Sequence, residues 1–124
     1  MATKFYKCNH CGNVIEKIID SKVPVFCCGE KMEELVPNTV EASGEKHIPV
    51  VTHLQDNILK IEVGSVHHPM LPEHHISFIY VETEHGGIRI DLKDQPVAVV
   101  HLGEEKAVAV YEYCNLHGLW KVEL

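Results

Sequence analysis

Apolar and polar residues alternate in two stretches of the chain, residues 59–63 and 88–92. Leucine, isoleucine or valine occupies every second position there, with charged residues between them. Successive side chains of a β-strand point to opposite faces, so this period of two predicts strands with one buried face. Residues 76–81, 97–102 and 107–113 are more continuously apolar, which predicts strands that are buried more completely.

Two glycine-containing turns, at residues 85–87 and 102–104, separate these predicted strands. Their spacing is typical of an antiparallel sandwich. No window of the sequence has a helical period. We therefore predict a mainly β protein in which residues 37–124 form an antiparallel β-sandwich.

Residues 1–36 are too few to bury a stabilising hydrophobic core. A closed metal site of four thiolates would supply the missing stability, and the candidate ligands are Cys8, Cys11, Cys27 and Cys28. Neighbouring side chains of an extended strand point apart, so the adjacent cysteines can share an ion only if the chain bends, as Gly29 permits. Ligand type leaves both zinc and iron open. The alternative is four separate thiols, buried or redox-active.

The connection between the two segments is predicted near Pro37, because turn-forming residues follow from there to Gly44. We predict a four-cysteine domain over residues 1–36 and a sandwich domain over residues 37–124.

Charge is distributed unevenly between these segments. Residues 1–36 hold five lysines and five acidic residues, whereas residues 37–124 hold six basic and thirteen acidic ones, so the net charge of −7 lies in the second segment. This argues against nucleic acid and anionic membranes as partners. Residues 1–8 contain no apolar signal segment, and no apolar run is long enough to cross a membrane. We therefore expect a soluble cytoplasmic protein, in which the five cysteines bind metal rather than form disulfides.

A second candidate metal site begins with Cys114 and His117. They lie three residues apart at the end of the predicted strand 107–113, where a bend at Gly118 can aim both side chains at one ion. By itself, such a pair is equally compatible with a core cysteine and a surface histidine.

Upstream histidines strengthen the metal interpretation. The second segment holds nine of the ten histidines, including His47 and the adjacent pairs 67–68 and 74–75. Only one member of an extended pair can face a given site. One imidazole from each pair, added to His47, His117 and Cys114, would provide five ligands. Structural zinc closes at four ligands, so a five-ligand set with an open position favours iron and a small oxygen species.

Five blocks of sequence resemble the signatures of desulfoferrodoxin, the two-iron superoxide reductase family. They occur in order along nearly the whole chain: Tyr6-Lys7-Cys8-Asn9-His10-Cys11-Gly12-Asn13, Cys27-Cys28-Gly29-Glu30, Glu45-Lys46-His47-Ile48-Pro49-Val50, Val63-Gly64-Ser65-Val66-His67-His68-Pro69-Met70 and Glu112-Tyr113-Cys114-Asn115-Leu116-His117-Gly118-Leu119-Trp120-Lys121.

This resemblance implies two irons per chain. One would be held by the four cysteines in a desulforedoxin-like domain. The other would lie in an immunoglobulin-like sandwich, with Cys114 as axial ligand and four equatorial histidines, His47, His68, His74 and His117. Glu45 and Lys46 match the family's mobile loop beside the open position, where they would serve catalysis.

The implied activity is one-electron reduction of superoxide to hydrogen peroxide, with electrons from rubredoxin or a similar small donor. The resemblance also implies a homodimer. An electron-transfer protein with cupredoxin-like copper is the alternative, although copper sites of that type need only two histidines and usually a methionine after the second. A zinc-stabilised binding module would explain only the four cysteines.

Overall fold

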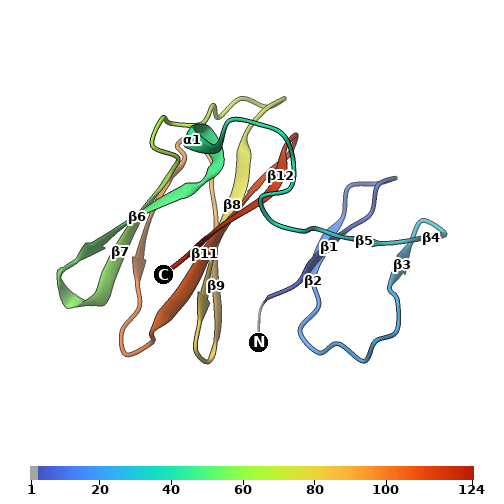
Figure 1. Ribbon diagram of the computed structural model, residues 1–124, viewed down its shortest axis with the longest axis horizontal. Helices are drawn as coiled ribbons and strands as arrows, with labels where there is room; N and C mark the ends of the chain where they lie inside the picture. Colours follow the sequence, from blue (N-terminus) through green and yellow to red (C-terminus); the bar gives the residue numbers. More distant parts are fainter. Residues whose placement is uncertain (1–2) are drawn as a thin grey trace. The chain divides into compact units, whose positions relative to one another are not determined.

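The computed structural model describes residues 3–124, so the first two residues of the predicted domain 1–36 lie outside the described part. The chain divides into two compact units, Met1–Val36 and Pro37–Leu124 (Figure 1). The division falls at Pro37, where the sequence predicts the connection. Across residues 3–124, no helix is long and apolar enough to cross a membrane.

The first unit is built from short antiparallel strands around the cysteines. One sheet has the order β2-β1-β5, and a two-stranded hairpin pairs β3 with β4. The strands are β1 (Phe5–Lys7), β2 (Val14–Glu16), β3 (Phe26–Cys27), β4 (Glu30–Lys31) and β5 (Glu33–Glu34).

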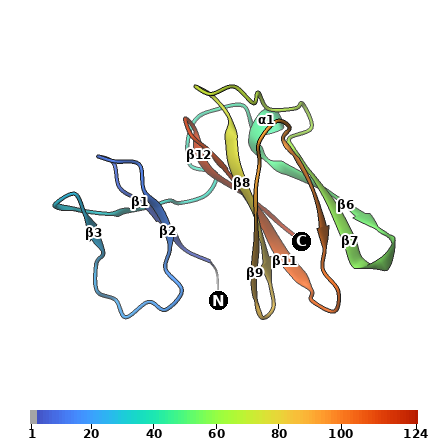
Figure 2. The same cartoon turned by 180° about the vertical axis from the view of Figure 1, so that it is seen from behind.

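The second unit is a sandwich of two antiparallel sheets, seen from opposite sides in Figures 1 and 2. One sheet has the order β10-β7-β6 and the other β12-β11-β8-β9. Their strands are β6 (Pro49–Leu54), β7 (Ile58–Val63), β8 (Ile76–Thr83), β9 (Gly86–Asp91), β10 (Val97–His101), β11 (Ala107–Cys114) and β12 (Gly118–Glu123). The predicted mainly β fold and the antiparallel sandwich are confirmed.

The core lies between the two sheets. Leu59, Ile61 and Val63 of β7 are almost fully buried, as their alternation predicts, and they pack with residues of β8 and β11 from the facing sheet. The same core extends to Cys114 at the end of β11. One end of the hydrophobic core therefore leads directly to the candidate metal ligands.

The structure also contains a short helix that the sequence does not predict. Helix α1 (Gly44–His47) is a single turn before β6, and a 3₁₀ turn, η1 (Gln55–Asn57), joins β6 to β7. One turn is too short to display a 3.6-residue hydrophobic period, so pattern analysis cannot detect it. This turn places Glu45, Lys46 and His47 together at one end of the sandwich.

Candidate metal centres

The four cysteines of the first unit converge on one point. Their sulfur atoms lie within 4.8 Å of one another, as the sequence predicts for a single site. The required bend is present, because Cys28 and Gly29 have positive φ angles of 55° and 75°. This bend allows the adjacent Cys27 and Cys28 to face the same point.

Hydrogen bonds shift the pKa values of two of these thiols in opposite directions. The Cys11 backbone N–H donates to the Cys8 sulfur at 3.4 Å and lowers the pKa of Cys8 to about 6. Hydrogen bonding with Cys11 is the main cause that raises the pKa of Cys28 to about 12. Four thiolates can share this small space only if a cation balances their charge, so the cluster fits a four-cysteine metal site.

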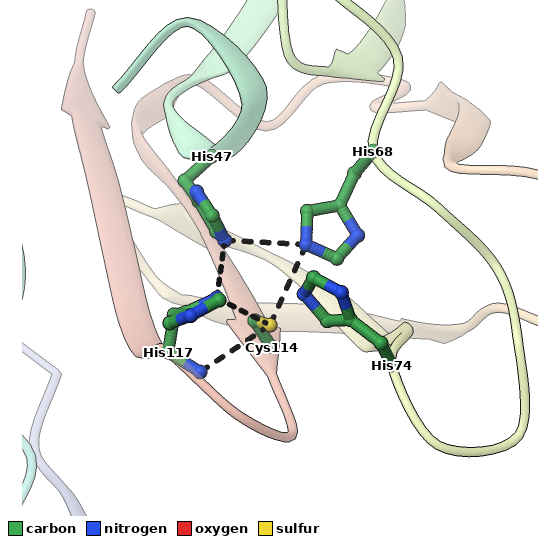
Figure 3. Close-up of side chains that lie close together, drawn as sticks. All are labelled: His47, His68, His74, Cys114 and His117. Carbon is green, nitrogen blue, oxygen red and sulfur yellow. Dashed lines mark hydrogen bonds between the residues drawn. The ribbon is translucent and has the colours of Figure 1, made fainter. Parts of the chain in front are cut away.

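The second cluster is assembled from three segments of the second unit (Figure 3). His47 ends helix α1, His68 and His74 belong to the connection between β7 and β8, and the β11–β12 turn brings Cys114 together with His117. Their ligand atoms lie within 4.8 Å of one another. The structure therefore brings the four imidazoles and the thiol together, which the sequence could only suggest.

The four imidazoles form a closed ring. Neighbouring ring centroids are 4.7 Å apart for His47 and His68, 4.5 Å for His68 and His74, 5.1 Å for His74 and His117, and 4.9 Å for His117 and His47. Each neighbouring pair is edge-to-face. In Figure 3 the four imidazoles and the Cys114 sulfur point toward a common centre, as expected of five ligands of one metal ion.

Backbone carbonyls determine which nitrogen of two of these histidines faces inward. The Nδ1 of His47 lies 2.7 Å from the carbonyl oxygen of Ser43, and the Nδ1 of His68 lies 2.7 Å from that of Pro69. Because a carbonyl can only accept, each Nδ1 carries the proton when the ring is neutral, and each Nε2 presents a lone pair. The two Nε2 atoms are only 3.2 Å apart.

Two facing lone pairs repel unless a cation lies between them. A proton is poorly held there, because burial is the main cause that lowers the pKa of His47 and that of His68, the latter to about 4. Within the described residues, the buried Nε2 of His74 also has no hydrogen-bond partner. These donors therefore fit a bound metal ion, which would accept all three lone pairs.

Cys114 is completely buried at the base of the ring. Burial raises the pKa of its thiol, whereas the backbone amides of His117 and Leu116 lower it by donating to the sulfur. The His117 N–H lies 3.4 Å from the sulfur. The turn thus provides a thiolate site that is shielded from water and hydrogen-bonded.

The remaining members of the adjacent histidine pairs lie outside the cluster. His67 pairs with the carboxylate of Glu62 at 2.8 Å, and the Nδ1 of His75 contacts the carbonyl of Leu71 at 3.0 Å. One histidine of each pair faces the site, which is the limit that extended backbone imposes.

Glu45 and Lys46 lie on the exposed surface of α1, next to His47. Burial is the main cause that lowers the pKa of His47 and of His74, and the positive charge of Lys46 lowers both further. The lysine is therefore close enough to act electrostatically on two members of the ring.

Sequence reasoning missed the residues that support the ring. Trp120 stacks on His47 with ring centroids 4.9 Å apart, and its indole N–H donates to the carbonyl of His117 at 3.1 Å. Gly64 allows the backbone of α1 to approach closely. The position of Trp120, three residues after His117, could have indicated that its side chain lies near the site. The carbonyl groups that contact His47 and His68 leave no sign in the sequence, because every residue carries a carbonyl.

Comparisons with known proteins agree with this layout. The desulfoferrodoxin family model matches residues 39–123. Desulfoferrodoxin from Syntrophotalea carbinolica is 42% identical over 120 residues, covering 95% of this chain and 94% of the relative. Desulfoferrodoxin from Nitratidesulfovibrio vulgaris is 40% identical over 122 residues, covering 97% and 95%.

Among solved structures, the superoxide reductase from Treponema pallidum superposes with a TM-score of 0.82 at 31% identity, over 99% of this chain and 100% of that one. The two ligand clusters fit the two-iron layout of desulfoferrodoxins. The family model, the sequence identity and the superposition each cover most of the chain, so the protein belongs to the desulfoferrodoxin family.

Proposed function

We propose that this protein is a superoxide reductase that converts superoxide to hydrogen peroxide by one-electron reduction. The observation that supports this most directly is the closed ring of four imidazoles with one buried thiol at its base. Five ligands of this kind suit iron and leave one position of an octahedron for a small oxygen species. The solved relative from Treponema pallidum is a superoxide reductase.

The proposed ligand sets follow the two clusters. In the domain over residues 37–124, the catalytic iron is bound by His47, His68, His74, Cys114 and His117. In the domain over residues 1–36, the second iron is bound by Cys8, Cys11, Cys27 and Cys28. Support comes from the convergence of the ligand atoms in each set. The four imidazoles also exceed the two that the cupredoxin-like alternative needs.

An iron held by these five residues would supply the one electron that reduces superoxide, and two protons would complete hydrogen peroxide. The chain's own residues prepare this step. Lys46, exposed on α1, attracts the anion toward the ring, and its charge already acts on His47 and His74. Glu45, exposed on the same turn, would offer a carboxylate beside the iron site. The buried Cys114 would hold the iron as a thiolate.

Because no dioxygen is formed, electrons must come from another protein, and we propose rubredoxin or a similar small donor in the cytoplasm. We also propose that the protein is a homodimer. In support, the first unit exposes large apolar side chains, including Ile18 at 81%, Ile19 at 85% and Phe26 at 65% of their surface. Exposed apolar side chains that form a contiguous patch often mark an interface.

Pulse radiolysis of the reduced protein tests the function. We expect superoxide to disappear in a second-order reaction that yields hydrogen peroxide without dioxygen, in a protein that contains two irons. Release of dioxygen would indicate dismutation instead. A protein with one copper or one zinc and no reaction with superoxide would favour the electron carrier or the binding module.

A further inference from the structure

Asn115 lies inside the Cys-x-x-His turn and binds the backbone on both sides of His74. Its side-chain oxygen accepts a hydrogen bond from the His75 N–H at 2.8 Å, and its side-chain N–H donates to the Glu73 carbonyl at 3.0 Å. Its backbone N–H also donates to the His75 carbonyl at 3.2 Å. Three hydrogen bonds therefore connect the turn that carries Cys114 to the segment that carries His74.

His74 depends on such a connection more than His47 and His68 do. The rings of His47 and His68 are each oriented by a carbonyl at Nδ1. Among residues 3–124, no comparable acceptor contacts the Nδ1 of His74, and its Nε2 is buried without a partner. Its backbone is otherwise held locally by a bridge to Leu71. Its position in the ring is thus determined mainly by where its backbone lies.

The strands alone do not fix that backbone relative to the sulfur. Pairing between β11 and β8 ends at Cys114 and Ile76, after an irregularity between Tyr113 and Cys114. His74 lies beyond the last paired residue, in the connection from β7. The hydrogen bonds of Asn115 extend the contact between these two chain segments beyond the last strand pair, to the residues on both sides of His74.

We propose that Asn115 is a positioning residue that places His74 at its distance from Cys114 and thereby sets the affinity and the ligand field of the iron. This inference rests on the proposed function only in assuming that iron binds to this cluster. Loss of a hydrogen bond that orients a metal ligand typically lowers metal affinity by about 10- to 100-fold.

The test compares wild type with Asn115→Ala in the full, iron-loaded chain. We expect the variant to release the iron of the second unit to a ferrous chelator about tenfold faster or more. We also expect a shift in the thiolate-to-iron absorption band of the oxidised protein, because the imidazole ligand moves relative to the sulfur. If this variant does not fold, Asn115→Asp keeps the acceptor for the His75 N–H, replaces the donor to Glu73 with a negatively charged oxygen, and gives the same test of iron release.

Asn57→Gly is the matched control. Asn57 also spans a turn with its side-chain amide, donating to the carbonyls of Gly103 and Glu105 at 2.9 and 2.8 Å, and its φ of 55° tolerates glycine. It lies between β6 and β7, at the end of the sandwich away from α1 (Figure 1). The proposal would be overturned if the folded Asn115 variant released iron and absorbed light as the wild type does. It would also be overturned if Asn57→Gly changed both properties as much as the Asn115 variant. An iron-loaded wild type that does not reduce superoxide would contradict only the proposed function, because both readouts concern binding.

Discussion

At the scale of single residues, the charge of Lys46 opposes that of its surroundings. The net charge of −7 lies in residues 37–124, which should repel superoxide. Lys46 is the only lysine or arginine between residues 32 and 59, and it lies beside the imidazole ring. A local positive field can raise the rate at which an anion reaches a site even on an acidic protein.

We expect Lys46→Ala to slow the second-order reaction with superoxide by about tenfold, the lower range of electrostatic steering. Iron content should not change, because Lys46 is not a ligand. Pulse radiolysis at low ionic strength measures the rate. Lys106→Ala is the control, since it removes the same charge from an exposed residue just before β11, whose opposite end carries Cys114. Equal rates for the two variants would contradict the steering role.

Glu112 is a second residue whose charge conflicts with its environment. It is completely buried on β11, and within the described chain neither carboxylate oxygen has a hydrogen-bond partner. Burial raises the pKa of Glu112 to about 9 from an ordinary value of 4.5. The folded protein therefore keeps a proton that the unfolded chain releases above about pH 4.5.

It follows that this group makes the folded state less stable as pH rises from about 4.5 to about 9. The slope is at most about 1.4 kcal/mol per pH unit, the value for one proton. In Glu112→Gln we expect this loss to disappear. Urea unfolding at about pH 5 and about pH 8, at equal iron loading, measures it. Glu104→Gln, at an exposed position, should keep the wild-type dependence, and a wild-type slope in Glu112→Gln would disprove this assignment.

At the scale of elements, helix α1 rests on the backbone that follows β7. The Glu45 carbonyl accepts hydrogen bonds from the Val66 N–H at 3.0 Å and the Ser65 hydroxyl at 3.2 Å. A Cβ atom at Gly64 would lie 2.5 Å from that same carbonyl oxygen and 3.0 Å from the Ile48 oxygen. Both clashes are with backbone atoms, so a side chain at this position would displace the helix that presents His47.

Gly64→Ala should therefore lower the iron affinity of the second unit by about tenfold or more, the range seen when ligand support is lost. Iron content and the absorption of the oxidised protein report the change. Gly86→Ala is the matched control, because a Cβ there meets no described atom within 4 Å. If both variants retained iron equally, the close contact with α1 would not be what positions His47.

At the scale of the whole molecule, each unit contains a complete ligand set. The four cysteines lie within the first unit, and the five residues of the ring lie within the second. Neither cluster takes a ligand from the other unit. The two irons should therefore be separable by mutation.

We expect Cys28→Ser to remove the iron of the first unit and to loosen residues 3–36, because so small a unit depends on its metal. The reaction with superoxide should remain largely intact. Cys114→Ser is the reciprocal variant and should remove the thiolate-to-iron absorption of the second unit. Should Cys28→Ser keep the second iron yet lose the reaction, the first iron would be an obligatory electron relay.

By itself, the sequence determined the strand pattern, the boundary near Pro37 and the residue types available to each metal site. These follow from local rules, since hydrophobic period and turn residues act over a few positions. The four cysteines also predict one site, because a unit of this size lacks another source of stability.

Only the tertiary structure decided how the imidazoles meet. Spacing allows either member of pairs 67–68 and 74–75, and a choice between them came only from family resemblance. The carbonyls of Ser43 and Pro69, the hydrogen bonds of Asn115 and the close approach at Gly64 complete the ring. Such contacts join residues far apart in the chain, often through backbone atoms that every residue shares, so no local pattern reveals them.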